Sequence, residues 1–363
     1  MAAEHERFMR RVLELGALAP FTSPNPRVGA VLVRSGRTLN EAFHEGAGGA
    51  HAEALVLDDV DATDATLYVN LEPCVHHGRT PPCAPAIVAA GVRTVVVAHE
   101  DADARVRGRG LAYLRSHGVE VVTGVLEQEA RRLNSPYLLQ RQSGRAFLTL
   151  KLAVSMDGRM SASDRSSRWI TGPEARARVH RRRAEVDAIL VGAGTVLNDD
   201  PHLDSRLDGA VRQPARVVVD AAGVVPPTAA VFEGEARVIV GTTDRASHEV
   251  QTAWKEVGAE VHVLPESPDG VDLEEMLRRL AAAGMVEVFC EGGARLATSL
   301  LHEGLVDRLE LFVAPILLGS GGAQLGDLGI ATMRESRRWN IAAVERIGDD
   351  VALALEPPRT RRV

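Results

Sequence analysis

The chain has 363 residues, 45% of them hydrophobic and 25% charged, and a formal net charge of −7 at pH 7. This length is sufficient for two domains that each bury a core. The negative charge argues against non-specific binding to nucleic acid, and the lack of any apolar run of about 18 residues argues against a membrane span. The charged, amphipathic segment 1–20 differs from a signal peptide, so we expect a cytoplasmic protein.

The first half alternates β-branched strands with helical segments, which is the pattern of an α/β layered domain. We expect strands at 28–33, 65–71, 93–98 and 119–124, and helices at 51–57, 84–91 and 108–118. The polar stretch 140–145 is interpreted as a linker, which divides the chain into domains at 1–144 and 145–363.

The second half repeats this alternation and is expected to form a second α/β domain. Its expected strands begin in the segment 146–158 and continue at 187–192, 215–220, 236–241, 259–264, 286–293 and 308–317. The last residues, 357–363, are expected to fray.

Two short motifs in the first half carry the residue types of a zinc site. His51 and Glu53 lie at the start of an expected helix, and Cys74 and Cys83 flank a Pro-rich loop. One imidazole and two thiolates form a tetrahedral Zn²⁺ site that keeps one position for water, whose pKa the metal lowers toward neutrality. Glu53 is expected to move a proton from this water to a leaving amine. The motifs therefore predict hydrolytic deamination at zinc bound by His51, Cys74 and Cys83.

Two other interpretations of the cysteine pair stay open. A disulfide would be unusual in the cytoplasm, where close cysteines more often bind a metal or act in catalysis. A closed structural zinc site would need a fourth protein ligand, which His76 or His77 could provide.

The second half contains two glycine turns that follow expected strands. The stretch 192–197 begins like a Rossmann fingerprint, but Leu197 takes the place of the third glycine, so we reject that interpretation. Near residue 291 a strand ends, and Gly292 and Gly293 precede a helix expected to begin near Ala294. Free backbone N–H groups at such a helix start would bind a phosphate.

Longer stretches of both halves resemble one known family. "PNPRVGAVLV" (24–33), "VHHGRTPP" (75–82) and "GRGLAYL" (108–114) resemble the N-terminal domain of the bifunctional riboflavin-biosynthesis deaminase/reductases. "LKLAVSMDGRMSASDRSSRWIT", "GAGTVLNDDPHLDSR", "EGGARL" and "VAPILLGS" resemble the C-terminal reductase domain of that family. The resemblance implies an α/β chain with an N-terminal cytidine-deaminase-like three-layer domain and a C-terminal dihydrofolate-reductase-like domain.

The resemblance also implies two reactions on a small phosphorylated pyrimidine. In the first, the zinc site deaminates 2,5-diamino-6-ribosylamino-4(3H)-pyrimidinone 5′-phosphate. In the second, NADPH supplies a hydride that reduces the ribosyl side chain to a ribityl group. By the same resemblance the protein is expected to form a homo-oligomer, a dimer or a tetramer.

For the deaminase, the resemblance places four residues at the substrate: Asn25, His44, His76 and Arg79. His76 and His77 are then pocket residues rather than zinc ligands. The chain departs from the family at 101–104, which reads DADA where the family has D-P-N-P. Because a carboxylate would repel the substrate phosphate, we expect Asp103 to lie away from it.

For the reductase, the resemblance assigns cofactor and substrate contacts. The implied NADPH contacts are Ala153, Trp169, Thr195, Asp199, Gly293, Ala294, Arg295, Leu296, Ala297, Thr298 and Ser299. The implied substrate contacts are Ser167, Arg183, Leu203, Arg206 and Glu291. Arg183 and Arg206 suit a phosphate clamp, although the helical run 180–183 could instead be a solvated face.

Lys151 is one of only two lysines in a chain that otherwise uses arginine, and the resemblance places it in the reductase active site. We expect it at the end of its strand, near Asp199, which would orient it and share its catalytic role. A compact ammonium can direct one charge at a carbonyl oxygen as hydride arrives.

Two other functions remain open on the residues alone. A nucleic-acid or nucleoside deaminase with an accessory nucleotide-binding domain would share the zinc chemistry, but aromatic residues make up only 4% of the chain. A zinc-stabilised scaffold that does not turn over substrate would have no use for Glu53.

Overall fold

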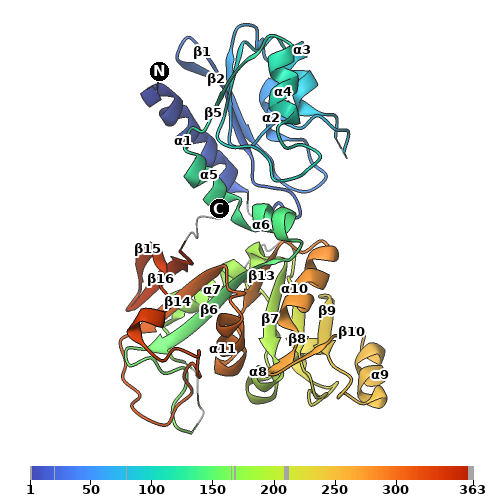
Figure 1. The fold of residues 1–363 in the computed structure, drawn as a ribbon, viewed down its shortest axis with the longest axis vertical. Coiled ribbons are helices and arrows are strands. Elements are labelled where there is room, and N and C mark those ends of the chain that lie inside the picture. Colours follow the sequence, from blue (N-terminus) through green and yellow to red (C-terminus); the bar gives the residue numbers. More distant parts are fainter. Residues whose placement is uncertain are drawn as a thin grey trace. The chain divides into compact units, whose positions relative to one another are not determined.

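The computed structural model describes residues 2–19, 21–78, 80–164, 166, 169–207 and 212–358. The chain divides into two compact units, Met1–Gly144 and Arg145–Val363. Each unit has its own sheet (Figure 1). Each also has its own hydrophobic core.

The sheet of the first unit has five strands in the order β2-β1-β3-β4-β5. They are β1 (Gly29–Arg34), β2 (Arg37–Phe43), β3 (Thr66–Val69), β4 (Thr94–Val97) and β5 (Glu120–Thr123). β1 is antiparallel to both neighbours, and β3, β4 and β5 are parallel. The two-residue loop between β1 and β2 has positive φ at both Ser35 and Gly36, which is the turn that matches the twist of a hairpin.

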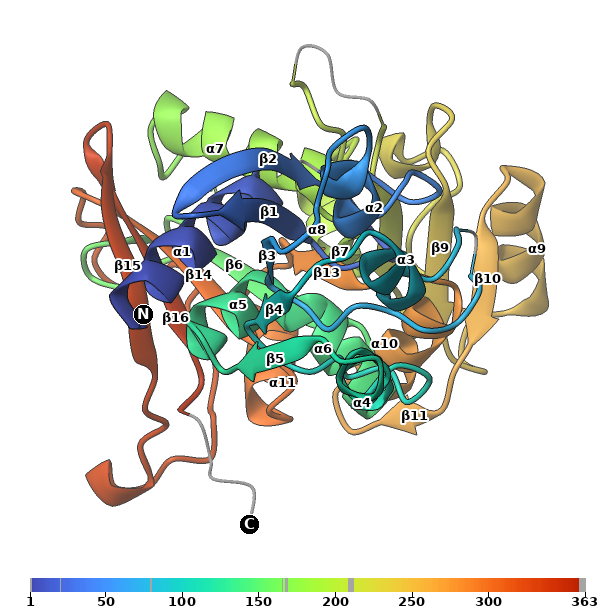
Figure 2. The same ribbon diagram turned by 90° about the horizontal axis from the view of Figure 1, so that it is seen from above.

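Helices cover both faces of this sheet. They are α1 (Ala2–Leu18), α2 (Ala52–Leu57), α3 (Cys83–Ala89), α4 (Arg109–Ser116), α5 (Glu127–Leu133) and α6 (Ser135–Ser143). Figure 2 shows α1 and α5 on one side of the strands and α2, α3 and α4 on the other. The amphipathic N-terminal helix packs Phe8, Met9 and Val12 into the core. The three-layer α/β arrangement expected from the sequence is confirmed.

Close packing of α1 on β1 depends on a glycine. A Cβ atom on Gly29 would lie 2.1 Å from the backbone oxygen of Val12, so a larger residue could not occupy this position without displacing the helix. The packing fixes β1, whose preceding loop carries Asn25.

The prediction of an irregular linker at 140–145 is wrong for most of this stretch. Residues 140–143 form the last turn of α6, which is polar because it is exposed rather than because it is irregular. The helix ends at Gly144, which adopts the left-handed conformation that favours glycine, and the second unit begins at Arg145.

The second unit is built on a nine-stranded sheet with the order β10-β9-β8-β7-β13-β6-β14-β16-β15. Its strands are β6 (Phe147–Ser155), β7 (Ala188–Gly192), β8 (Ala215–Val219), β9 (Val238–Thr242), β10 (Glu260–Val263), β13 (Glu287–Cys290), β14 (Arg308–Ala314), β15 (Asn340–Ile347) and β16 (Asp350–Glu356). The strands from β10 to β14 are parallel, and β16 and β15 add an antiparallel hairpin. A small separate ladder joins β11 (Glu266–Ser267) to β12 (Gly270–Val271).

The parallel part of this larger sheet has a hydrophobic core on each face. Its helices are α7 (Pro173–Glu185), α8 (Ala193–Asp199), α9 (His248–Glu256), α10 (Leu273–Ala282) and α11 (Ala294–His302), with 3-10 turns at Ala230–Phe232 and Met333–Glu335. Leucines of β6 pack with α10 and α11 on one face, and the other face buries Phe289 with Val179 of α7 and Trp254 of α9. Near-continuous apolar strands are what a two-sided parallel sheet requires.

The sequence located the parallel strands of this unit but missed the C-terminal hairpin. All residues of β15 except Ile347 are exposed, so this strand lacks the alternation that marks a half-buried strand. The expected position of Lys151 at a strand end is also wrong, because β6 continues to Ser155 and leaves Lys151 at its centre. We expected residues 357–363 to fray. Of these, residues 359–363 lie outside the described part of the chain.

Candidate active sites

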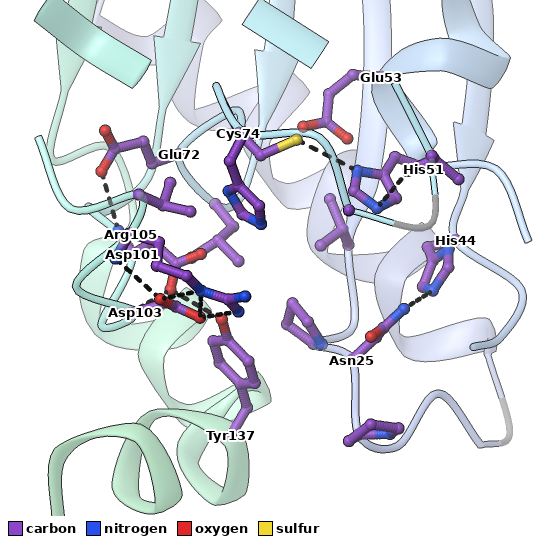
Figure 3. A pocket seen from close by; sticks show the side chains of 18 of the residues that line it. Asn25, His44, His51, Glu53, Glu72, Cys74, Asp101, Asp103, Arg105 and Tyr137 are labelled. Atoms are coloured by element: carbon purple, nitrogen blue, oxygen red, sulfur yellow. Dashed lines mark hydrogen bonds and ion pairs between the residues drawn. The ribbon is translucent and has the colours of Figure 1, made fainter. Parts of the chain in front are cut away.

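A cavity of about 350 Å³ lies in the first unit, at the ends of the strands that carry the zinc motif (Figure 3). Figure 3 shows His51, Glu53 and Cys74 converging above it, with Asn25 and His44 on one side. The opposite side is formed by Asp101, Asp103, Arg105, Tyr137 and Arg141.

Three local structures bring the expected zinc ligands together. His51 is the residue before α2, Cys74 follows β3 and Cys83 begins α3. His51 Nδ1 lies 3.2 Å from Cys83 Sγ and 3.7 Å from Cys74 Sγ, and the three ligand atoms are all within 4.8 Å of one another. A tetrahedral zinc ion holds sulfur and nitrogen ligands about 3.5–3.8 Å apart, so these residues fit the metal.

A residue that the sequence did not identify holds the histidine in place. His51 Nε2 lies 3.1 Å from the hydroxyl oxygen of Thr80. Because Nδ1 faces the two sulfurs, the Nε2–H is the ring donor, and Thr80 accepts its hydrogen bond. Such a partner fixes the tautomer and the ring plane of a metal-binding histidine.

Cys74 and Cys83 interact directly, and the backbone N–H of Cys83 donates to Cys74 Sγ at 3.4 Å. The interaction of the two side chains lowers the pKa of Cys74 to about 4 and raises the pKa of Cys83. A dication would displace the remaining thiol protons, as metal binding to thiols requires.

Glu53 lies in the first turn of α2 and is 5% exposed. Burial raises the pKa of its carboxyl to about 7. Figure 3 shows the carboxylate directed toward Cys74 and His51. A carboxyl group with this pKa can both accept and deliver a proton near neutral pH.

The alternative of a closed structural site finds no fourth ligand. In the described part of the chain the metal-binding cluster consists of His51, Cys74 and Cys83. His76 lines the cavity instead, and its Nδ1 has no hydrogen-bond partner among the described residues. The cysteines are unbridged, so a disulfide is absent from this structure.

His44 and Asn25 form a fixed pair at the side of the cavity. His44 Nδ1 lies 2.9 Å from the backbone oxygen of Ala50 and therefore donates, which leaves Nε2 to accept from Asn25 Nδ2 at 3.0 Å. Burial lowers the pKa of His44, consistent with this neutral form. Since both ring nitrogens are engaged, His44 orients the Asn25 amide. Arg79 lies outside the described residues.

Glu72 joins the zinc loop to the opposite wall, a role that the sequence did not indicate. Its carboxylate accepts four backbone N–H groups, those of Asp101, Gly108, Gly110 and Leu111, at 2.8–3.2 Å. Asp103, which we expected to lie away from the substrate phosphate, lines the cavity and is paired with Arg105.

In the second unit the charged residues assigned to the reductase meet beside the centre of the sheet. β13 pairs Cys290 with Leu150 of β6, so Glu291 follows at the level of Lys151. Burial lowers the pKa of Lys151, and Glu291 is the group that most strongly opposes this shift. Glu291 is thus an acidic neighbour of Lys151 that the sequence did not indicate, and Asp199, the expected neighbour, lies at the end of α8.

Arg183 is engaged by the same glutamate. Its Nε and Nη2 donate to the two carboxylate oxygens of Glu291 at 2.6 and 3.0 Å, and Nη1 donates to the backbone oxygen of Asp204 at 2.9 Å. The Arg183 side chain is 14% exposed, and that of the neighbouring Arg182 is 11% exposed. The solvated-face interpretation of residues 180–183 is wrong for these two arginines.

The residues assigned to NADPH are distributed over several elements. The backbone N–H of Gly293, before α11, donates to the Thr195 hydroxyl of α8 at 3.1 Å. A Cβ on Gly292 would lie 2.6 Å from Leu296 Cδ2, so a larger residue here would displace the leucine side chain. Ala294, Arg295, Thr298 and Ser299 line an open cavity of about 600 Å³. Leu296 and Ala297 instead belong to the hydrophobic core that α10 and α11 form on one face of the sheet. Ala153 packs against the core on the other face.

The remaining reductase residues have different surroundings. Trp169 is 69% exposed, with the Arg176 guanidinium 4.6 Å from its ring centre. Leu203 is buried with a positive φ of 53°. Arg206 is 63% exposed, and its Nε lies 3.4 Å from Asp204. Ser167 lies outside the described residues.

Each half of the chain matches a known family model. Residues 2–99 match the cytidine and deoxycytidylate deaminase zinc-binding region, and residues 146–353 match the RibD C-terminal domain. In the described residues no helix has the length and apolar content that a membrane crossing requires.

Characterised relatives match along nearly the whole chain. The riboflavin biosynthesis protein RibD of Aquifex aeolicus is 40% identical over 335 residues, 92% of each chain, and that of Escherichia coli is 37% identical over 97% of this chain and 99% of its own. The structure of Acinetobacter baumannii RibD is similar with a TM-score of 0.89 at 34% identity, over 98% of this chain and 99% of that one. A Thermotoga maritima diaminohydroxyphosphoribosylaminopyrimidine deaminase/5-amino-6-(5-phosphoribosylamino)uracil reductase gives 0.86 at 34% identity with the same coverage.

Proposed function

The chain belongs to the RibD family of riboflavin-biosynthesis proteins, which join a zinc-dependent deaminase to an NADPH-dependent reductase, and on this premise we propose how its residues divide the two reactions. Residues 1–144 form the deaminase domain and residues 145–363 the reductase domain. The substrate is 2,5-diamino-6-ribosylamino-4(3H)-pyrimidinone 5′-phosphate, which loses ammonia first and is reduced second.

In the deaminase, His51, Cys74 and Cys83 bind zinc, which when bound supplies the Lewis acidity that makes water a nucleophile near neutral pH. Glu53 takes the proton of the attacking water and passes it to the leaving amine. Its burial next to the cysteines, and its pKa near 7, suit both halves of this task. Asn25, His76 and Arg79 hold the substrate, and His44 acts by orienting the Asn25 amide.

In the reductase, bound NADPH supplies the hydride. Lys151 donates a hydrogen bond to the carbonyl oxygen of the opened ribosyl chain and stabilises the charge that develops there. Glu291 holds the Lys151 ammonium and faces the substrate, and Arg183 keeps Glu291 ionised and in position. Ser167, Leu203 and Arg206 complete the substrate site.

For the cofactor we keep the contacts that the family resemblance assigned. Ala153, Trp169, Thr195 and Asp199 lie along it, together with the turn and helix 293–299. The hydrogen bond between Gly293 and Thr195 supports a shared site, because it holds the start of α11 against α8.

We further propose a homo-oligomer, a dimer or a tetramer, and a cytoplasmic location that keeps the zinc ligands reduced. The exposed strand β15 supports the proposed homo-oligomer, because Ile341 and Val344 are each 63% exposed at the edge of the sheet. Apolar residues on an open edge favour pairing with a second copy. Light scattering of the purified protein measures the mass and tests this.

The observation that carries the proposal is the convergence of the three zinc ligands and Glu53 in one cavity. Incubating the protein with the diaminopyrimidinone phosphate, with and without NADPH, followed by mass analysis, tests it. Without NADPH the substrate should lose ammonia only, and with NADPH the product should also gain two hydrogens. Unchanged substrate under both conditions, with a zinc-loaded enzyme, would contradict the proposal.

A further inference from the structure

The wall of the deaminase cavity that faces Asn25 carries a pair of opposite charges (Figure 3). Asp103 accepts hydrogen bonds from Arg105 Nε at 3.0 Å and from Arg105 Nη2 at 2.7 Å. The Asp103 side chain is 10% exposed and that of Arg105 is 64% exposed. The carboxylate is thus set into the wall, and the guanidinium extends from it.

Three further residues build Asp103 into this wall. Its backbone N–H donates to Asp101 Oδ1 at 2.9 Å, and the same oxygen accepts the Tyr137 hydroxyl at 3.0 Å. The Arg141 guanidinium lies 3.9 Å from Asp103 Oδ2 and 5.2 Å from the centre of the Tyr137 ring. The pair is therefore supported by both the loop 101–108 and helix α6.

The exposed charged side chains of this wall are guanidinium groups, which attract an anion. The Arg105 and Arg141 side chains are 64% and 34% exposed, whereas that of Asp103, whose hydrogen bonds to Arg105 lower its pKa to about 2, is 10% exposed. The other carboxylates of the wall, Asp101 and Glu72, are buried and accept hydrogen bonds from the protein itself. Among the described residues that line the cavity, Arg105 and Arg141 are the lysine or arginine side chains.

The geometry of Arg105 leaves one edge of its fork for a ligand. Asp103 occupies the edge formed by Nε and Nη2, and Nη1 makes no hydrogen bond within the described part of the chain. A guanidinium binds phosphate oxygens with two parallel N–H groups, which the edge formed by Nη1 and Nη2 still offers.

We propose that Arg105 binds the 5′-phosphate of the deaminase substrate and that Asp103 is the positioning residue that aims it. This rests on the proposed function of the first domain. The pyrimidine amine must lie at Glu53 and the zinc ligands, and the phosphate is at the other end of the substrate. Asp103 does not repel that phosphate, because its charge is already paired and serves to orient the arginine.

Steady-state deamination by the full-length zinc enzyme tests the proposal. Arg105→Gln should raise KM for the phosphorylated substrate on the order of 10- to 100-fold with kcat unchanged, as expected for losing hydrogen bonds to a charged group. The constant for competitive inhibition by inorganic phosphate should rise as well. Arg109→Gln is the matched control, since Arg109 is exposed at the start of α4 and does not line the cavity, and it should behave as wild type.

The positioning role is tested separately by Asp103→Asn. This variant should raise KM by about 3- to 10-fold alone and should have no further effect in the Arg105→Gln background, because it acts through Arg105. Arg105→Lys should recover part of the lost affinity. A lower KM in Asp103→Asn would overturn the proposal, since it would mean that the carboxylate repels the phosphate.

The outcomes also separate this inference from the proposed function. An active wild type together with an Arg105→Gln variant whose KM and phosphate inhibition are unchanged would overturn the inference alone. A fall in kcat without a rise in KM would do the same, because it would indicate a general structural effect. A zinc-loaded wild type that releases no ammonia would overturn the proposed function and the inference with it.

Discussion

The two proposed active sites of this chain are built from different kinds of structure. The deaminase residues come from helix starts and loops: His51 precedes α2, Glu53 lies in its first turn and Cys83 begins α3. The reductase residues include Lys151 at the centre of β6 and Arg183 on α7, which meet through Glu291. The first site gathers an imidazole, two thiols and a buried carboxyl group, whereas the second pairs opposite charges beside a sheet.

Because of this contrast, substitutions should have different effects at the two sites. Removing one member of a metal site abolishes binding of the ion on which the chemistry depends. Removing one member of a buried ion network leaves its partner unpaired and changes position and charge together. Substitution of a zinc ligand should therefore abolish deamination. Substitution within the buried ion network of the second site should lower the rate of reduction only in part.

The largest effect is expected from Cys74→Ser. Zinc content should fall from one ion per chain to near none, and ammonia release should disappear, because a serine hydroxyl does not replace a thiolate at this site. Reduction of pre-deaminated substrate should continue. Metal analysis and the two assays measure these outcomes.

Cys290→Ala is the control for this experiment. Cys290 is the remaining cysteine, and it is buried in β13 of the reductase domain. This variant should keep one zinc ion per chain and full deamination. Full ammonia release by metal-free wild type would rule out the zinc site.

The next effect in size concerns the second site. Lys151→Arg should lower the rate of hydride transfer on the order of 10²-fold, the scale of losing one well-placed electrostatic group. The broader guanidinium would also stand beside Arg183, which already acts on Lys151 as a like charge. Stopped-flow measurement of NADPH oxidation gives the rate, and fluorescence titration should find cofactor binding retained.

Lys255 offers a matched control because it is the other lysine of the chain and is exposed on α9. Lys255→Arg should reduce substrate at the wild-type rate. If Lys151→Arg did so too, Lys151 would have no catalytic role.

A smaller effect is expected from Thr80→Val, which removes the hydroxyl that accepts from His51 Nε2. Metal affinity should fall about 10- to 100-fold, the usual range for losing a partner of a metal-binding histidine. Competition with a chelator measures the affinity. Thr80→Ser keeps the hydroxyl and should bind zinc as wild type does; equal losses in both variants would show that the hydroxyl is not the cause.

The sequence identified those parts of the site that depend on local chemistry. His51, Cys74 and Cys83 were recognisable because a metal demands particular residue types in a particular order. The parallel strands were recognisable because burial on both faces requires near-continuous apolar runs.

The contacts that the sequence did not reveal join segments far apart in the chain. Thr80 lies 29 residues from His51, and Tyr137 lies 36 residues from Asp101. A threonine or a tyrosine has many roles in a fold, so its type alone indicates no partner. The pairing of Asp103 with Arg105 was not predicted for a related reason, because the direction of the arginine is defined only by the folded loop.

The strand β2 was missed although a local signal existed. Residues 35–36 read Ser-Gly, which favours a tight hairpin turn, and the structure has positive φ at both positions. The segment after it is only partly buried and therefore lacks a strong apolar pattern. Lys151 was placed wrongly because a buried strand gives no sign of where it ends.

The central claim is that one chain carries two chemically separate sites, and Glu53→Gln tests it most directly. We predict that this variant keeps one zinc ion per chain and releases ammonia roughly 10²–10⁴-fold more slowly, the span of a lost general acid/base group. When the variant is given pre-deaminated substrate and NADPH, its rate of NADPH oxidation should equal that of the wild type. A parallel fall of both rates in a folded, zinc-loaded protein would contradict the account.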